Sequence, residues 1–220
     1  METLKEARYK VFAEIVSVDS DVHEKFLEKF KSQAGDFSDA LARAVLAWRD
    51  LDAKVHENKK LAYVSALVFT ALTLQIQSMK LFLSGQPVAS GNLFRQVVES
   101  IALALVCSGK DLNILDRFIE DKYSTANAIH DVLRNSKKLG LLDDGVKELK
   151  EARVFYHNYS HPTKLTIASL ISFSEEGLYF AASYDDRKID QYNKEVNARV
   201  RLAKVLINFV EAVKANAGKW

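Results

Sequence analysis

Residues 61–83 read LAYVSALVFTALTLQIQSMKLFL, and this apolar stretch decides the fold. It has the length of a membrane-spanning helix, but polar residues interrupt it, among them Ser65, Thr70, Thr73, Gln75, Gln77 and Lys80. A helix that is apolar nearly all round also fits the centre of a soluble helical bundle. We therefore predict a buried helix here and no membrane partner.

Apolar residues at helical spacing continue on both sides of this segment. Before it, two short helical patterns are split near Ser17–Ser20, the second ends at Gly35, and a further helix runs to about Asn58. After a loop at 84–91, helices are expected at about 93–107, 111–121, 123–138, 143–159 and 187–215. Two prolines and eight glycines among 220 residues favour such long helices.

Late in the chain, an alternating pattern replaces the helical period. Residues 165–173 and 178–183 alternate between apolar and polar side chains, and the segment Ser174–Gly177 between them has the composition of a turn. The sequence thus predicts a mainly α-helical fold, a bundle of about seven to nine helices with one β-hairpin near 165–183. We expect a single domain over residues 1–220, in which the helices of 1–59 pack on a bundle formed by 60–215.

Composition and missing motifs exclude several classes of function. The chain has 31 Lys and Arg against 29 Asp and Glu, and its formal charge of +2 creates no overall field that demands a nucleic acid or a membrane. The single cysteine, Cys107, cannot form an intramolecular disulfide, which fits a reducing cytoplasm. Phosphate-binding glycine motifs, His-Glu-x-x-His and Glu-x-x-His are all missing from the sequence, so we expect neither a cofactor nor a metal site.

The densest polar cluster reads RVFYHNYSHPT and spans residues 153–163. Arg153 and His157 are four positions apart and share one face of a helix, whereas Pro162 places His161 at the helix end. Histidine can move a proton near neutral pH, and arginine can hold a phosphate. Arg153, His157 and His161 are therefore candidate catalytic residues for phosphodiester cleavage, with the arginine stabilising charge and a histidine as acid or base.

A structural role explains the same cluster. Histidines near a helix C-terminus interact with the helix dipole, and the tyrosines and the His-Pro step can lock the passage from helix to hairpin. Arg95 and Glu99 lie four apart on an apolar helix, either as an ion pair with each other or as groups that orient a histidine. We treat Arg95, Glu99, Tyr156 and Asn158 as candidate binding or supporting residues.

Two short stretches carry a resemblance to known proteins. NLFRQVVES (92–100) and FYHNYSHPT (155–163) resemble a group of poorly characterised bacterial helical proteins with an Arg-x-x-x-Glu helix and a Ser-His-Pro helix end followed by a hairpin. More distantly, the chain is similar to the HEPN superfamily, helical bundles common in toxin–antitoxin and phage-defence systems. The resemblance covers roughly residues 60–215 in the order of elements.

Membership of that superfamily would imply a metal-independent ribonuclease of a defence or stress system. In such enzymes an arginine and a histidine separated by four to six residues meet their copies across a dimer. Here three residues separate Arg153 from His157, and seven separate Arg153 from His161. Because many relatives are non-catalytic, a protein-interaction or regulatory module is the alternative, and a small-ligand binder with a pocket between 61–83 and 93–107 is a third. We expect a cytoplasmic homodimer with RNA or protein as its partner.

Overall fold

The chain folds into a bundle of helices with one small sheet. The computed structural model describes residues 3–56, 58–159, 162–173, 177–178 and 182–220, and this part of the chain contains nine α-helices. They are α1 (Leu4–Val16), α2 (Ser20–Asp52), α3 (Lys59–Leu83), α4 (Pro87–Ser108), α5 (Ile114–Ile119), α6 (Ala128–Asn135), α7 (Asp143–Tyr156), α8 (Lys164–Ser169) and α9 (Ile189–Ala217). The predicted mainly α-helical bundle is confirmed.

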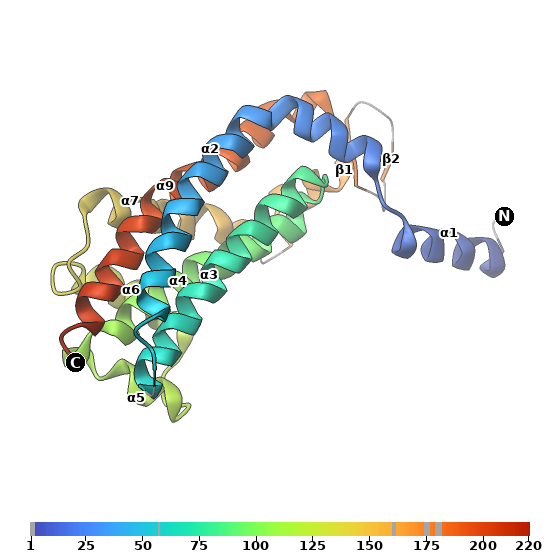
Figure 1. The fold of residues 1–220 in the computed structure, drawn as a ribbon. Helices are drawn as coiled ribbons and strands as arrows, with labels where there is room; N and C mark the ends of the chain where they lie inside the picture. Colours follow the sequence, from blue (N-terminus) through green and yellow to red (C-terminus); the bar gives the residue numbers. More distant parts are fainter. Residues whose placement is uncertain (1–2, 57, 160–161, 174–176, 179–181) are drawn as a thin grey trace.

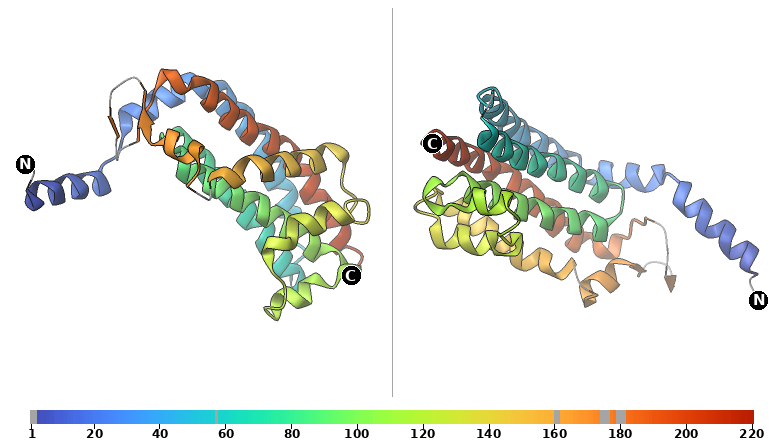
Figure 2. Two further views of the ribbon diagram at one scale, coloured as in Figure 1. Left: turned by 180° about the vertical axis from the view of Figure 1, so that it is seen from behind. Right: turned by 90° about the horizontal axis from the view of Figure 1, so that it is seen from below.

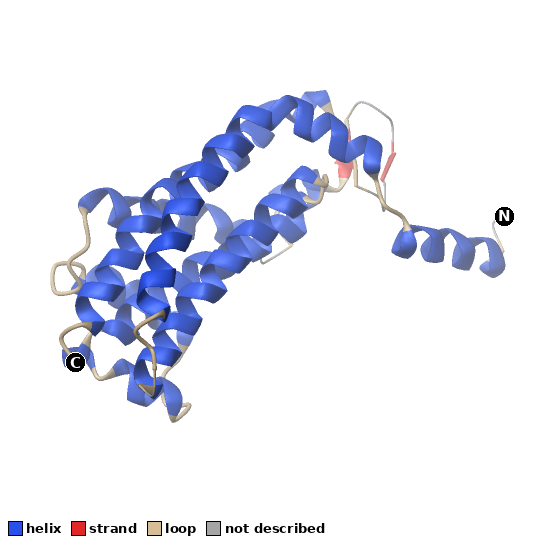
Figure 3. Cartoon of the chain, in the orientation of Figure 1, coloured by secondary structure: helices blue, strands red, loops and turns tan. Residues whose placement is uncertain are grey.

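Short elements complete the chain. Single turns of 3-10 helix lie at η1 (Lys110–Leu112), η2 (Thr125–Asn127), η3 (His157–Tyr159) and η4 (Asp186–Lys188). Strand β1 (Ile171–Ser172) pairs antiparallel with β2 (Gly177–Leu178), with Ile171 opposite Leu178. Figure 3 shows these two strands at the end of the bundle where α2 begins.

The long helices run alongside one another, and α4 lies at their centre. α2 packs along α9, α3 packs along α4, and α4 also contacts α5, α6, α7 and α9 (Figure 1). Every residue from Ile101 to Ser108 in α4 is buried. This run, and not α3, is therefore the segment that is covered on all sides.

Helix α3 is instead covered on one side. Its buried face meets α2, α4 and α9, while Tyr63, Phe69 and Ile76 on its other face are about half exposed. By length and composition α3 could cross a membrane, and 44% of its most apolar window is buried. The expectation that residues 61–83 form a buried helix holds for one face of α3.

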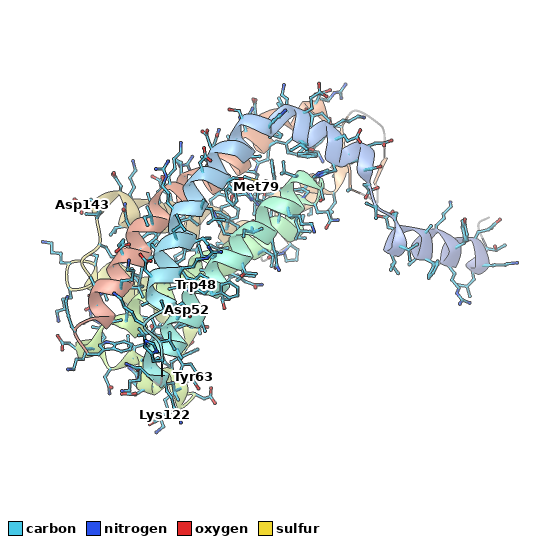
Figure 4. The ribbon with its side chains drawn as sticks, viewed as in Figure 1. Trp48, Asp52, Tyr63, Met79, Lys122 and Asp143 are labelled. Atoms are coloured by element: carbon cyan, nitrogen blue, oxygen red, sulfur yellow. The ribbon has the colours of Figure 1, made fainter. Side chains whose placement is uncertain are left out.

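Aromatic and polar contacts join α2 to α3. Near one end, the indole N–H of Trp48 donates to Ser65 Oγ at 3.0 Å, and Ser65 Oγ donates to Asp52 at 2.7 Å. Figure 4 shows Trp48 and Asp52 on the part of α2 that lies beside α3. Toward the other end, Phe26 packs edge-to-face on Phe82 with 5.4 Å between ring centroids. Both ends of the helix pair are thus fixed by side chains that reach across it.

Several predicted boundaries were wrong. α2 continues through Gly35. One glycine destabilises a helix only slightly, and the burial of neighbouring side chains such as Phe37 and Ala40 outweighs that cost. The one non-helical residue inside α2 is Phe30 (φ −116°, ψ 19°), and the helix ends at Asp52, not near Asn58. α4 begins at Pro87, inside the expected loop, since proline is well suited to the first helical turn.

The first strand of the predicted hairpin begins later than expected, and residues 174–176 and 179–181 of that hairpin lie outside the described residues. Residues 164–169 form α8, whose first turn is capped by the Thr163 side chain accepting from the Thr166 amide. The β-pairing begins only at Ile171 and covers two residues on each described strand. Alternation at 165–169 was a poor guide because a capping threonine favours a helix start over an extended strand.

Helix α1 differs from the long helices α2, α3, α4 and α9 because it has no buried side chain. It has a capping box in which Thr3 and Glu6 bond to each other's backbone amides. None of its residues is buried, and it extends away from the bundle in every view (Figures 1 and 2). The tertiary contacts of the bundle therefore do not hold this helix.

Candidate functional site at the end of helix α7

A buried ion pair lies beneath the predicted cluster. Glu195 and Arg199 are one turn apart on α9, and both side chains are 0% exposed. Arg199 Nη1 donates to Glu195 Oε2 at 2.8 Å and to the backbone oxygen of Glu195 at 2.8 Å. Two charges removed from water are tolerated only when their remaining donors and acceptors are also satisfied.

The guanidinium of Arg199 finds those partners on three other helices. It donates to the hydroxyls of Ser78 on α3, Ser90 on α4 and Tyr156 on α7. The rings of Phe82 and Phe94 lie 5.1 Å and 5.2 Å from its Cζ atom, within cation–π range. Burial alone would lower the pKa of Arg199, but the carboxylate of Glu195 raises it through its charge and its hydrogen bond, so the guanidinium stays charged.

The carboxylate of Glu195 is satisfied by the residues that follow Arg153. Tyr156 OH donates to Oε2 at 3.1 Å, Tyr159 OH donates to Oε1, and Gln191 Nε2 donates to Oε1 at 3.0 Å. Burial raises the pKa of both tyrosines well above the ordinary value of 10, and the nearby Glu195 raises it further for Tyr159. Both hydroxyls therefore remain protonated donors.

The absence of a side chain at Gly91 allows the Tyr159 ring to pack closely against α4. A Cβ atom at Gly91 on α4 would lie 2.5 Å from Cγ of the Tyr159 ring, closer than side chains approach one another. The ring therefore rests directly on the backbone of α4. Together with the hydroxyl bond to Glu195, this contact fixes the turn η3 at the end of α7.

Arg153 and His157 lie on the other side of this anchored segment. Both are exposed, on α7 and at its C-cap respectively, and His157 keeps helical backbone angles (φ −55°, ψ −32°). Their spacing of four therefore places them on one helix face, as the sequence predicts. Tyr156, which lies between them in sequence, points inward to Glu195.

The other predicted residues have mixed outcomes. Arg95 Nε lies 2.9 Å from Glu99 Oε1, so these two form the intrahelical ion pair that was one of the two alternatives. Tyr156 is part of the buried network and does not reach the surface. His161 and the side chain of Asn158 lie outside the residues that the structure describes.

Sequence reasoning missed Glu195 and Arg199. A signal was present, because these opposite charges lie four residues apart on the apolar face marked by Tyr192, Val196 and Val200. Charged residues on an inward face need partners, and two such residues at helical spacing can supply each other. The tyrosines of the 153–163 cluster were the matching donors.

Neither metal ligands, nor a reactive cysteine, nor a similar known protein identifies the function of this site. Among the described residues, no group of three His, Cys, Asp or Glu side chains is placed to hold a metal ion. Cys107 is buried, and burial raises the pKa of its thiol to about 12. Comparison with family models, curated proteins and solved structures found no match to this chain.

Proposed function

We propose that this protein is a metal-independent ribonuclease of the HEPN type, acting as a homodimer in a defence or stress system. One observation carries the proposal. Arg153 and His157 share an exposed face of a helix end, and Tyr156 and Tyr159 anchor the opposite face to a buried ion pair. Catalytic groups act best when a rigid support fixes them.

In the proposed reaction His157 removes the proton from a ribose 2′-hydroxyl, and the resulting oxygen attacks the adjacent phosphorus. The bond to the 5′-oxygen of the next nucleotide breaks, and that oxygen takes up a proton from a second acid. Arg153 stabilises the negative charge that develops on the phosphate oxygens. The products are a 2′,3′-cyclic phosphate and a 5′-hydroxyl end. His161 is assigned the role of the second acid from its sequence position alone.

The test incubates purified protein with a mixed RNA pool in the presence and absence of EDTA. Wild type should cleave equally in both, and the 3′ ends should be 2′,3′-cyclic phosphates. His157→Ala and Arg153→Ala should each lower the rate by a factor of about 10²–10⁴. His130→Ala, a change of an exposed histidine on α6, is the matched control and should keep full activity.

Two results would contradict this function. Equal activity in wild type and His157→Ala would indicate a contaminating nuclease, and no activity in either on a broad pool would remove the support for catalysis. The proposal also requires that light scattering give about twice the chain mass of 24.8 kDa. A mass of one chain across micromolar concentrations would contradict the dimer.

A second function, a non-catalytic interaction module, is favoured by α1. Phe12 and Ile15 on this helix are 61% and 74% exposed, and an isolated helix of 13 residues is only marginally stable in water. Such a helix gains stability when a partner covers its apolar side. Loss of self-association in Phe12→Ser/Ile15→Ser, with RNA cleavage absent in wild type, would favour this function.

The third possibility, a ligand pocket among the central helices, has little room. The cavity lined by α3, α4 and α9 measures about 10 Å³ and is bordered by Val68, Ile101 and Leu206. That volume is about what one water molecule needs. We therefore do not propose ligand binding between α3 and α4.

A further inference from the structure

A large open pocket lies between α7 and α9, on the helix that carries Arg153. Its volume is about 680 Å³, in the range of ligand-binding sites in proteins. Ala152, Val154 and Phe155 on α7 and Ala198 on α9 supply an apolar lining. Figure 2 shows α7, in yellow to orange, next to α9 in red.

Phe155 makes this lining aromatic and rigid. Its ring packs edge-on against Tyr156, with 4.8 Å between centroids and 79° between planes, and lies 6.1 Å from the ring of Tyr159. Because both tyrosines are held by Glu195, the Phe155 ring has a fixed support. A fixed aromatic side chain in an open pocket is suited to stacking against a planar group.

The rim of the pocket is positively charged. Four cations line it, against the two carboxylates of Glu148 and Glu151: Lys147, Lys150, Lys194 and Arg201. Arg201 pairs with Glu148 at 3.0 Å, and Lys147 lies 4.0 Å from Glu151. Within the described part of the chain, Lys150 on α7 and Lys194 on α9 make no such ion pair, so each helix contributes one cation available to an anion.

Lys150 connects the pocket to the predicted catalytic face. It precedes Arg153 by three residues and His157 by seven, so the three side chains follow one line along the exposed side of α7. The line is about 10 Å long, from a rise of 1.5 Å per residue. Of these three residues only Lys150 lines the pocket, so it is the residue shared by the pocket and the line.

We infer that the α7–α9 pocket holds one base of a single-stranded RNA whose neighbouring phosphates contact Lys150 and Lys194. This inference rests on the proposed function, since it places the strand so that the next phosphate reaches Arg153 and His157. An aromatic side chain beside cations is the arrangement by which proteins bind single strands with little sequence preference. An acidic peptide satisfies the lysines but has no planar base for Phe155.

The binding experiment is separate from cleavage. A fluorescein-labelled 12-nucleotide single-stranded RNA of mixed sequence is titrated with full-length His157→Ala protein in EDTA, and fluorescence anisotropy is measured at several salt concentrations. An abasic ribose-phosphate strand of equal length is titrated in parallel. We expect the intact strand to bind about ten-fold more tightly, the size of one base–aromatic stacking contact.

Two variants of the His157→Ala protein locate the contacts. Lys150→Ala/Lys194→Ala should lower the slope of log K against log salt by about 1.4, the value for two lost contacts to single-strand phosphates. Lys31→Ala/Lys54→Ala removes two exposed lysines of the α2 region and should leave the slope unchanged. Ala198→Phe, which fills the pocket from a half-buried position, should remove the preference for the intact strand; its urea midpoint checks that it folds.

The possible outcomes separate the pocket from the catalytic proposal. The pocket proposal is wrong if both double-lysine variants have the same salt slope, or if the abasic strand binds as tightly as the intact strand. Either result would overturn it even if wild type cleaves RNA. No RNA binding, or an acidic peptide that binds more tightly and loses affinity in the same variants, would also overturn it. RNA bound through the pocket and left uncleaved by wild type would support the pocket and contradict the ribonuclease.

Discussion

The segment from Arg153 to Tyr159 has two faces that differ in their exposure to solvent and in their hydrogen bonds. On the inner face, Tyr156 and Tyr159 are buried and their hydroxyls donate hydrogen bonds to Glu195. On the outer face, Arg153 and His157 are exposed. The inner residues are therefore expected to set stability and position, while the outer ones reach the solvent. Substitutions on the two faces should separate folding from activity.

Helix α9 repeats the contrast with two Arg–Glu pairs. Arg199 and Glu195 are fully buried, whereas the side chains of Arg201, two residues further on, and its partner Glu148 are 50% and 15% exposed. The donor–acceptor distances are nearly the same, 2.8 Å and 3.0 Å. What differs is access to water, which screens the outer pair and replaces either partner when the other is removed.

The largest expected effect is therefore from Glu195→Ala. Removing this carboxylate leaves the buried guanidinium of Arg199 and two tyrosine hydroxyls without their acceptor, which should lower the free energy of unfolding by about 3–5 kcal/mol. Urea unfolding followed by circular dichroism measures it. Glu148→Ala is the matched control and should cost less than about 1 kcal/mol. Equal costs in the two variants would contradict the contrast.

A smaller effect is expected from Gly91→Ala. The added methyl group would meet the Tyr159 ring at 2.5 Å, so the ring or α4 must move. Overpacking of this kind costs about 1–3 kcal/mol. Gly35→Ala, in a helix position where a Cβ atom would meet nothing within 4 Å, should instead be neutral or stabilising by up to about 1 kcal/mol. A stable Gly91→Ala protein would show that Tyr159 is not held against α4.

The inner face also predicts a dependence on alkaline pH. The pKa of Tyr159 is raised above 10 in the folded protein by burial, so above pH 10 the unfolded chain loses a proton that the folded chain keeps. The unfolded state then binds fewer protons, and stability falls as pH rises, by at most about 1.4 kcal/mol per pH unit for each such tyrosine.

Unfolding midpoints between pH 9 and 11 measure this slope. Tyr159→Phe should make the decline less steep, although the variant is less stable at pH 7. Tyr9→Phe, a change in the exposed helix α1, is the control and should leave the slope as it is in wild type. An unchanged slope in Tyr159→Phe would show that its hydroxyl already ionises in the folded state.

The sequence predicted the helices better than it predicted their ends and their tertiary contacts. Periodic apolar residues located most of the helices, and Gly109 marked the end of α4 as expected. Gly35 misled because one glycine costs a packed helix only about 1 kcal/mol, which the burial of neighbouring side chains exceeds. Thr163 was not recognised as a helix cap, so α8 was taken for part of a strand. Local patterns do not contain the tertiary packing that decides such cases.

For the candidate site, the sequence predicted the local geometry and not the long-range contacts. The spacing of Arg153 and His157 was enough to place them on one helix face, because a helix has a fixed period, but it did not show that this face is exposed. The pairing of Tyr156 with Glu195 joins residues 39 positions apart, and only the tertiary fold brings them together. The shared face of Arg153 and His157 was thus predictable from one helix, whereas its exposure and the buried network beneath it were not.

The smallest expected effect on stability is from substitutions in α1, whose large apolar residues are exposed and not packed in the core. Phe12 and Ile15 on α1 are large apolar residues, as the core residues are, but they are 61% and 74% exposed. Phe12→Ser/Ile15→Ser should therefore change the free energy of unfolding of the bundle by no more than about 0.5 kcal/mol, measured by urea unfolding at a concentration where the protein is monomeric. Leu149→Ala, a fully buried change on α7, is the positive control and should cost about 2–5 kcal/mol. A loss of several kcal/mol in the α1 variant would mean that α1 packs on the bundle in solution. An unfolding midpoint that rises with protein concentration in wild type, but not in the variant, would mean that a second copy of the chain covers α1.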